Sequence, residues 1–292
     1  MATPAQWLEG ARPRTLPAAV SPVLAGTGVA AYVDQAVWWK AALALVVALA
    51  LQVGVNYAND YSDGIRGTDA DRVGPLRLVG SGAASPGSVR LAAFAAFGVA
   101  VLAGLALAAT TSWWLVPVGG LAVLAAWFYT GGSVPYGYRA LGEVMVFLFF
   151  GLVAVLGTTY VQTRSLPLPA WYAAVGVGVL ACALLVANNL RDIPTDRAVG
   201  KATLAVVLGE ERSRYLYVML VAAAGVALVA LVLTTSRVAL LGAAFVVPGV
   251  PAARMVLAGA TGRDLVPVLA RTGLSELLWA AGVFLGLLVA SL

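Results

Sequence analysis

The sequence contains no histidine and a single cysteine, Cys182. No imidazole is therefore available as a base or metal ligand, and one cysteine excludes an internal disulfide and any multi-thiolate zinc or iron–sulfur site. Only 11% of the 292 residues are charged, against about 25% in an average soluble domain. This shortage of charge excludes a disordered chain, a water-soluble enzyme of normal surface and a nucleic-acid-binding domain, so no nucleic acid is expected as a partner.

Hydrophobic residues are abundant, at 61% of the chain, and they fall into long runs. Because a helix needs about 20 apolar residues to cross a bilayer, we predict an all-α, polytopic membrane protein: a bundle of about nine transmembrane helices that forms a single domain over residues 1–292. The predicted spans are residues 16–33, 37–62, 89–109, 112–130, 140–162, 168–190, 214–234, 237–257 and 272–291.

The basic residues are distributed unequally between the two predicted membrane faces. The N-terminus and the loops near residues 63–88, 131–139, 191–213 and 258–271 carry all but three of the 18 lysines and arginines. The positive-inside rule makes that face cytoplasmic, and nine spans then put the C-terminus outside. The bias towards Arg, Ala, Val and Gly is typical of a GC-rich bacterial genome, which favours the plasma membrane of a bacterium.

The acidic residues are clustered. Eight of the 13 fall into two windows, residues 60–71 and 192–211, each at the cytoplasmic end of a predicted helix. In the first window, Asn56, Asn59, Asp60 and Asp63 stand at i, i+3, i+4 and i+7, which is one face of a helix. A polar face directed at lipid is costly, so this stripe is expected to face the interior of the bundle or a water-filled mouth.

A second stripe, made of Asn189, Asp192 and Asp196 with Asn188 beside it, ends the sixth predicted span. The two stripes lie about 130 residues apart on matching helices, which predicts a two-half internal repeat with motifs near residues 56–82 and 188–203. Proline lacks an N–H and disfavours a helical residue before it. We therefore expect this helix to end near Arg191, with Pro194 opening a short loop helix.

Carboxylates and amides without histidine or cysteine suit a hard cation, because Mg²⁺ takes one or two carboxylates and completes its shell with water and phosphate oxygens. The same two loops carry bases, among them Arg66, Arg77, Arg191, Arg197 and Lys201. Acids interleaved with bases predict a magnesium–diphosphate site, with Mn²⁺ as the second choice of metal. The aromatic residues at these helix ends, including Tyr129, Tyr136 and Tyr138, offer ring faces that attract a cation.

Four strings resemble motifs of the UbiA superfamily of membrane prenyltransferases, and more closely those of its menaquinone branch, the 1,4-dihydroxy-2-naphthoate polyprenyltransferases. They are NDYSDGIRGTD (residues 59–69), GPLRLVGSG (74–82), YTGGSVPYGYRALGE (129–143) and NNLRDIPTDRAVGKATLAVVLG (188–209). The resemblance runs over essentially the whole chain. DxxxD alone is a weak signal, but four motifs in order on one membrane face are a strong one.

The resemblance implies a reaction. Such enzymes bind a polyprenyl diphosphate through Mg²⁺ between two aspartate motifs, ionise it to an allylic cation and attach the chain to an aromatic ring. In the menaquinone branch the acceptor is 1,4-dihydroxy-2-naphthoate, its carboxylate leaves as CO₂, and the product is demethylmenaquinone. The expected partners are these two substrates and membrane lipid.

The resemblance and the residue patterns together give three sets of expected site residues. The expected metal ligands are Asp60, Asp63, Asp69, Asp192 and Asp196. The residues expected to act in catalysis are Asp63, Asp192, Asp196 and Lys201. The expected diphosphate- or substrate-binding residues are Asn56, Asn59, Arg66, Arg77, Tyr129, Gly132, Tyr136, Tyr138, Asn188, Asn189, Arg191 and Lys201. We also expect Lys201 or Arg77 to hold the carboxylate of the acceptor.

Other functions remain open at this stage. Within the enzyme class the acceptor could be a 4-hydroxybenzoate, a homogentisate, haem or chlorophyllide. A secondary transporter is the main alternative of another class. Transporter sites usually lie near the bilayer midplane, whereas these acids stand at helix ends on one face, which disfavours transport.

Overall fold

The computed structural model describes residues 2–67 and 76–292, and within these ranges it is built from helices, with one isolated β-bridge and no strand. The long helices are α2 (Pro17–Tyr32), α3 (Trp38–Arg66), α4 (Pro86–Thr110), α5 (Leu115–Phe128), α8 (Leu168–Ala198), α10 (Glu210–Thr234) and α12 (Val266–Ala290). Two further spans are composite: α6 (Gly142–Val146), the π-helix η3 (Phe147–Leu156) and α7 (Gly157–Thr163) form one, and the 3₁₀-helix η4 (Arg237–Phe245) and α11 (Val246–Leu257) form the other. The short elements are α1 (Pro4–Gly10), η1 (Pro13–Thr15), η2 (Tyr136–Tyr138), α9 (Leu204–Leu208) and η5 (Gly262–Leu265).

The prediction of an all-α, polytopic membrane fold is confirmed. Among the described residues, seven helices are long and apolar enough to cross a membrane, and the pair Pro4–Thr15 and Pro17–Tyr32, bent by 50°, passes the same test only when taken together. Each of the nine predicted apolar segments contains a helix. The exception in length is α5, whose 14 residues fall short of the roughly 20 that a full crossing requires.

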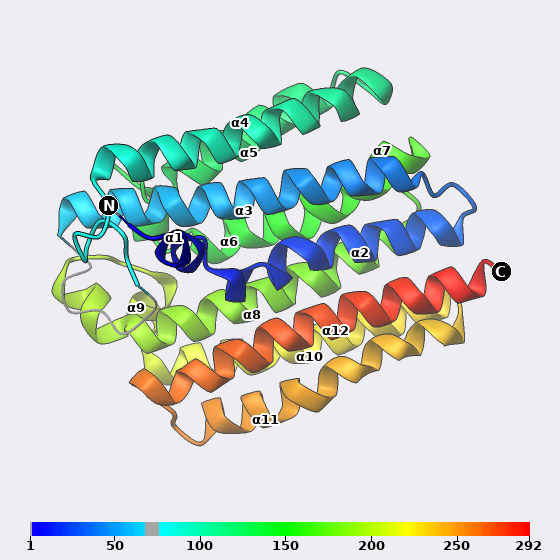
Figure 1. Ribbon diagram of the computed structural model, residues 1–292. Coiled ribbons are helices and arrows are strands. Elements are labelled where there is room, and N and C mark those ends of the chain that lie inside the picture. The colour runs from blue at the N-terminus through cyan, green and yellow to red at the C-terminus, as the bar shows by residue number, and fades with distance from the viewer. Residues whose placement is uncertain (1, 68–75) are drawn as a thin grey trace.

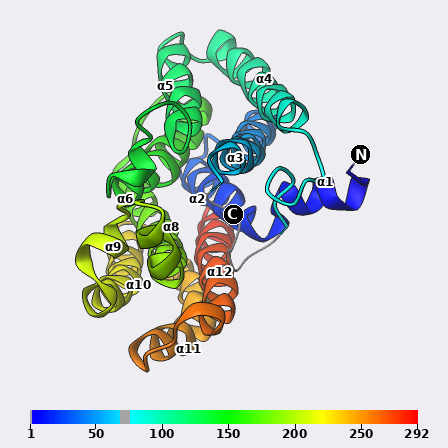
Figure 2. The same cartoon turned by 90° about the vertical axis from the view of Figure 1, so that its left-hand side faces the viewer.

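The helices run roughly side by side, and the two chain ends lie at opposite ends of the bundle (Figure 1). Viewed along the bundle, α2, α3, α8 and α12 occupy the middle, with α4 and α5 on one side and α10 and α11 on the other (Figure 2). The C-terminal ends of α3 and α8 point the same way, towards α1 and α9. We call this end, which carries both aspartate stripes, the motif end.

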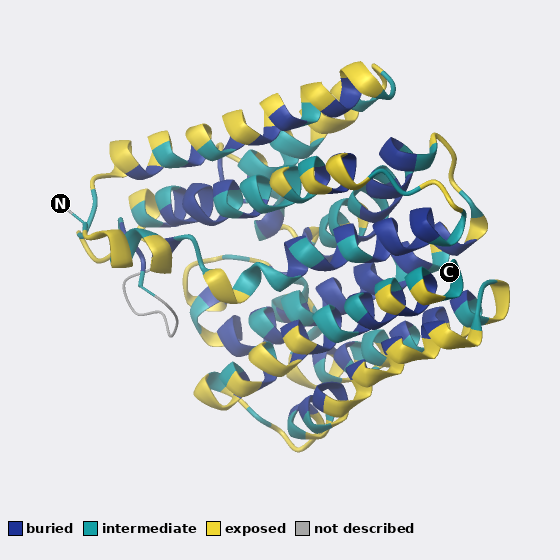
Figure 3. Cartoon of the chain, turned by 45° about the vertical axis from the view of Figure 1, so that its right-hand side comes forward, coloured by how far each residue is buried: buried dark blue, intermediate teal, exposed yellow. Residues whose placement is uncertain are grey.

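Burial follows this arrangement. Buried residues concentrate on the inner helices, whereas exposed residues run along the outward faces of the outer ones (Figure 3). Many exposed side chains are large and apolar, including Leu102 on α4, Leu121 on α5 and Val247 on α11. An extensive apolar exterior is stable in the hydrocarbon of a bilayer but not in water, so these faces are suited to contact lipid.

Helix α8 continues without interruption from Leu168 to Ala198, so the predicted end near Arg191 is wrong. Pro194 removes only one backbone donor, and other bonds hold the last turns. The Thr195 hydroxyl donates to the carbonyl of Asp192 at 2.9 Å, and the Val199 amide donates to the carbonyl of Thr195 at 3.2 Å. The second aspartate stripe therefore stays on a regular helix.

Helix η3 packs closely on α8 through two glycines. A Cβ at Gly151 would lie 2.8 Å from both the Cα of Gly178 and the carbonyl oxygen of Ala174. Glycine is thus required for the backbones to approach this closely. A π-helix is rare and frequently marks a functional site, and the opposite face of η3 lines the cavity described below.

Lys40 joins three helices at the end of the bundle away from the motif end. Its buried ammonium donates to the Thr110 carbonyl at 3.2 Å, the Thr111 hydroxyl at 2.8 Å and the Val161 carbonyl at 2.9 Å. Thr110 and Thr111 lie at the C-terminal end of α4, and Val161 lies in α7. A cation at helix C-termini is also favoured by the helix dipole.

We predict that Lys40→Met destabilises the protein, because three charge-assisted bonds are lost and buried oxygens are left without a donor. The expected cost is roughly 3 kcal/mol, seen as a fall in Tm of about 5 °C in detergent. The control is Arg237→Gln, which removes an exposed charge from the same end. Equal Tm values for the two variants would contradict the structural role of Lys40.

Candidate active site

A cavity of about 1820 Å³ runs through the bundle, from Arg191 and Lys201 at the motif end to Leu115 and Val161 near the other end. Ligand pockets usually measure about 300–1,000 Å³, so this space can hold more than one small molecule, or one very long molecule. Its walls are mainly apolar along α5 and η3, for example at Ala122, Phe149 and Val153. The polar residues gather at the motif end and along α3.

The first aspartate stripe lies at the C-terminal end of α3, and Asn56, Asn59 and Asp63 all line the cavity. Asn59 accepts a hydrogen bond from the Thr130 hydroxyl at 2.7 Å. Asp63 lies 3.5 Å from a guanidinium nitrogen of Arg77, which also lines the cavity. Gly67, with a φ of +71°, ends the helix just beyond the stripe.

Asp60 belongs to the same stripe but lies away from the cavity. Its two carboxylate oxygens accept the backbone amides of Leu78 and Val79 at 2.7 and 2.9 Å, and its side chain is almost completely buried. Both oxygens of Asp60 thus bind the 76–79 segment and the residue does not line the cavity, so this geometry gives the expected metal role of Asp60 no support. Asp60 thereby holds that segment, including Arg77, beside the cavity.

The second stripe is held by its own bases. The Arg191 guanidinium donates two hydrogen bonds to Asp192, from Nε to Oδ1 at 2.6 Å and from a terminal nitrogen to Oδ2 at 2.7 Å. It also donates to the Asn188 side chain at 2.9 Å. The Lys201 ammonium lies 3.6 Å from Asp196. Asn188, Arg191 and Lys201 line the cavity, and the two aspartates stand directly behind the two bases.

Tyr138 connects the two stripes. Its hydroxyl donates to Asp63 at 2.9 Å, and the Lys201 ammonium lies 5.1 Å from the centre of its ring. The backbone is tied as well, because the Ala202 amide donates to the Tyr138 carbonyl and the Ala140 amide to the Ala202 carbonyl. Contacts thus run without a break from Asp63 through Tyr138 and Lys201 to Asp196.

Arg66 of α3 and residues within the 129–138 segment itself fix the position of this segment. Arg66 donates to the carbonyls of Thr130 and Gly132, and it lies over the Tyr138 ring at 5.4 Å. Gly132 has a φ of +77°, which favours glycine. Tyr129 and Tyr136 both line the cavity and meet edge to face at 5.5 Å.

The Tyr136 hydroxyl donates to the Ala125 carbonyl of α5 at 2.8 Å, and burial raises the pKa of this phenol. It therefore remains a neutral hydrogen-bond donor at physiological pH. Its contact with α5 supports the cavity wall, which adds a structural role to the substrate contact expected from the sequence.

The acidic and thiol side chains of the site are the groups that could bind a metal. Within residues 2–67 and 76–292, no three acidic or thiol groups come together as they would around one ion. Asp69 lies outside the described residues. In donor chemistry alone, the carboxylate oxygens of Asp63, Asp192 and Asp196 are of the hard type that Mg²⁺ prefers, with water and phosphate oxygens completing its shell.

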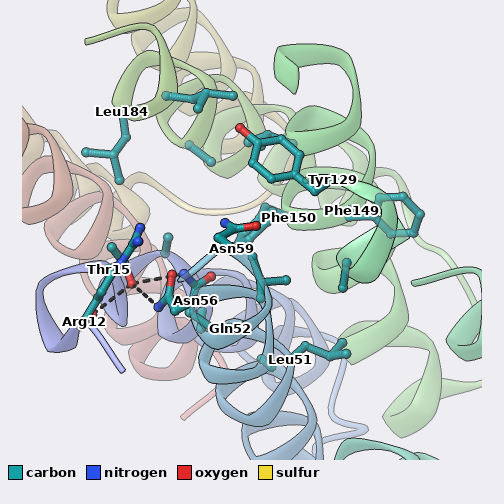
Figure 4. A pocket seen from close by; sticks show the side chains of 18 of the residues that line it. Arg12, Thr15, Leu51, Gln52, Asn56, Asn59, Tyr129, Phe149, Phe150 and Leu184 are labelled. Atoms are coloured by element: carbon teal, nitrogen blue, oxygen red, sulfur yellow. Dashed lines mark hydrogen bonds between the residues drawn. The ribbon is translucent and has the colours of Figure 1, made fainter. Parts of the chain in front are cut away.

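Sequence reasoning missed several residues of the cavity. Arg12, Thr15, Gln52 and Arg263 line it, and the first three lie together with Asn56 (Figure 4). Gln52 extends the α3 stripe by one turn, at four residues before Asn56, and that spacing was the available signal. Arg12 and Arg263 were counted only as positive-inside charges. Glu143 was also missed; it is buried and accepts from Asn189 at 2.9 Å.

The fold and the aspartate stripes define a membrane-embedded helical bundle whose cavity mouth carries paired acids and bases. The chain belongs to the UbiA prenyltransferase family, whose model matches residues 19–264. At 15% identity it has the same fold as a UbiA homolog from Archaeoglobus fulgidus bound to GPP and Mg²⁺, with a TM-score of 0.72 over 97% of this chain and 99% of that one. A UbiA homolog from Aeropyrum pernix K1 gives 0.73 at 17% identity, over 92% and 97% of the two chains.

Two relatives with higher sequence identity share one name. The chain is 56% identical to the 1,4-dihydroxy-2-naphthoate octaprenyltransferase of Mycobacterium tuberculosis, over 97% of both proteins. It is 40% identical to the protein of the same name in Escherichia coli, over 71% of this chain and 70% of that one.

We predict that Asp60→Ala loosens the 76–79 segment rather than removing a ligand. Two buried amides lose their acceptor, which costs about 1–3 kcal/mol. Hydrogen–deuterium exchange of this segment should therefore accelerate, with a lower Tm. Asp264→Asn, an exposed aspartate at the same end, serves as the control. Exchange at the wild-type rate in Asp60→Ala would refute this role.

Proposed function

We propose that the protein transfers a polyprenyl chain from polyprenyl diphosphate to 1,4-dihydroxy-2-naphthoate, with loss of CO₂, and so makes demethylmenaquinone in menaquinone biosynthesis. The observation that carries the proposal is the convergence of the two aspartate stripes, through Tyr138 and Lys201, at the mouth of a large apolar cavity. Such a site combines anion binding with a space for an isoprenoid tail. The names of the 56% and 40% identical relatives support the naphthoate acceptor.

The ion pairs of the two stripes suit a diphosphate. Asp63, Asp192 and Asp196 each contact a base, respectively Arg77, Arg191 and Lys201. When a diphosphate binds together with Mg²⁺, the bases can turn to the phosphate oxygens while the carboxylates face the metal. Opposite charges are therefore present for both partners, and no buried charge is left uncompensated.

Asp63, Asp192 and Asp196 would hold Mg²⁺, with Mn²⁺ as the second choice, and the metal would supply charge neutralisation to the leaving diphosphate. Arg77, Arg191 and Lys201 stabilise the negative charge that grows on the diphosphate as the C–O bond breaks. Asn59 and Asn188 offer further polar contacts at the same mouth. This stabilisation acts more on the transition state than on the bound substrate, as catalysis requires.

The transfer breaks the allylic C–O bond and the ring–carboxylate bond, and it forms the new C–C bond and the second C=O bond of CO₂. The allylic C–O bond breaks and its electron pair leaves with the diphosphate. The ring carbon that carries the carboxylate then forms the new C–C bond with the allylic cation. The bond from that carbon to the carboxylate breaks, CO₂ leaves, and its electron pair restores the aromatic ring. No net proton or external oxidant is needed.

The apolar walls of α5 and η3 suit the isoprenoid tail and exclude water from the cation. Phe149 and Phe150 line this region together with Tyr129, and aromatic faces attract cations. The charge distribution of the sequence supports a cytoplasmic motif end, an external C-terminus and a location in the bacterial plasma membrane.

The central experiment offers one polyprenyl diphosphate with several acceptors to the protein in membranes: 1,4-dihydroxy-2-naphthoate, 4-hydroxybenzoate and homogentisate. Prenylation of the naphthoate, with release of one CO₂ per product, is expected, and the other acceptors should react far more slowly. Preference for another acceptor would reject the naphthoate assignment. Release of diphosphate without any prenylated product would reject transfer itself.

We predict that activity requires a divalent metal and both stripes. Excess EDTA should abolish turnover, and Mg²⁺ should restore it. Asp63→Ala and Asp192→Ala should each keep less than about a tenth of the activity, a barrier increase of more than about 1.4 kcal/mol, while remaining folded. Glu211→Gln, an exposed acid at the same end, should retain full activity. Full turnover in EDTA would overturn the metal assignment.

A further inference from the structure

Four polar side chains form a cluster in the cavity, further from the motif end than Asp63. We call Arg12, Thr15, Gln52 and Asn56 the inner polar cluster, and all four line the cavity (Figure 4). The Thr15 hydroxyl oxygen accepts from the side-chain nitrogens of Gln52 and Asn56, both at 3.0 Å, and donates to the Arg12 carbonyl at 2.9 Å. These bonds join the 12–15 segment to α3.

The bonds of Thr15 fix the orientation of Gln52. A hydroxyl has one hydrogen, and that of Thr15 goes to the Arg12 carbonyl, so towards Gln52 it can only accept. The amide nitrogen of Gln52 must therefore face Thr15, and its oxygen must face elsewhere. Gln52 is only 8% exposed, and this oxygen has no hydrogen-bond partner within the described part of the chain.

A buried carbonyl oxygen without a partner needs an explanation, and a bound ligand provides one. Because this oxygen can only accept, the ligand must bring an O–H or N–H to it. The donor substrate has none, since its diphosphate is an acceptor and its tail is apolar. A ring hydroxyl of an aromatic acceptor fits the requirement.

The position of the cluster separates it from the diphosphate-binding residues. Gln52 lies seven residues before Asn59 on α3, which is roughly 10 Å along the helix axis. The bases at the mouth, Arg77, Arg191 and Lys201, contact the aspartates of the two motifs. The Arg12 side chain points into the cavity beside Thr15 (Figure 4), and its charge also interacts with Asp60 of the first motif. A guanidinium is well suited to bind a carboxylate.

We propose that the inner polar cluster binds the aromatic acceptor: Arg12 holds its carboxylate, and Gln52 Oε1 accepts the hydrogen of a ring hydroxyl. This inference rests on the proposed function and names the residues that recognise its acceptor. It moves the carboxylate contact from Lys201 or Arg77, which the sequence suggested, to Arg12. Lys201 and Arg77 then serve the diphosphate.

The test measures KM for each substrate separately, using Gln52→Leu and Arg12→Gln in membranes. Each variant should raise KM for 1,4-dihydroxy-2-naphthoate about ten-fold or more, the factor typical of one lost hydrogen bond to a buried group, and leave KM for the prenyl diphosphate unchanged. Lys201→Ala should show the opposite pattern.

Competitive inhibitors that lack one group identify the contact. Removing the carboxylate, as in 1,4-naphthalenediol, should weaken inhibition of the wild type but not of Arg12→Gln. Removing one hydroxyl, as in 1-hydroxy-2-naphthoate or 4-hydroxy-2-naphthoate, should for one of the two weaken inhibition of the wild type but not of Gln52→Leu. A glutamine with only a structural role would not produce this ligand-dependent pattern.

The matched control is Gln162→Leu. Gln162 is also buried, but its side chain is hydrogen-bonded to Val37, Thr27 and Thr158, and it does not line the cavity. This variant should lower Tm without changing either KM. Tm values for all variants report folding, and Arg12→Gln tests the site even if Gln52→Leu fails to fold.

The outcomes are distinguishable. Unchanged acceptor KM in both cluster variants, or an equal rise in both KM values, would overturn the acceptor site while wild-type transfer to the naphthoate upholds the proposed function. If the wild type transfers no chain to the naphthoate, the proposed function is wrong and the acceptor assignment falls with it.

Discussion

The contacts of Tyr138 are the constraint on which the site depends. Asp63 and Asp196 lie on α3 and α8, far apart in sequence, and the bundle alone does not join them. The Tyr138 hydroxyl binds Asp63, its ring lies beneath Lys201, and Lys201 binds Asp196. Arg66 and the backbone of Ala202 hold the same segment. One tyrosine on a connecting segment thus brings two distant carboxylates to one cavity mouth.

Charge compensation explains why so many ionisable groups can lie buried at this mouth. An isolated carboxylate in a poorly solvated place is costly, whereas one that contacts a base is tolerated. Asp63, Asp192 and Asp196 each contact a base at the mouth, and the pair formed by Arg191 and Asp192 is bidentate. The same bases can serve an anionic substrate. The stability of the site and its capacity for a diphosphate therefore have one electrostatic origin.

Backbone geometry shapes the cavity. Gly151 and Gly178 let η3 lie against α8, while the other face of η3 carries Phe149 and Val153 into the cavity. On the far wall, α5 is short and has no fully buried residue, so one thin helix separates the cavity from the outside of the bundle. Close packing on one side and a thin wall on the other leave room for a long apolar ligand.

The sequence by itself determined the membrane class, the approximate spans and the two stripes, because apolar run length and helical spacing are local properties. It also indicated Asp63, Asp192, Asp196 and Lys201, and the structure joins Asp63, Lys201 and Asp196 through Tyr138. Only the tertiary structure decided that Asp60 binds the amides of Leu78 and Val79, that α8 continues through Pro194, and that Arg12 and Gln52 enter the cavity. These depend on which groups meet across helices, and spacing along one helix carries no information about a partner on another.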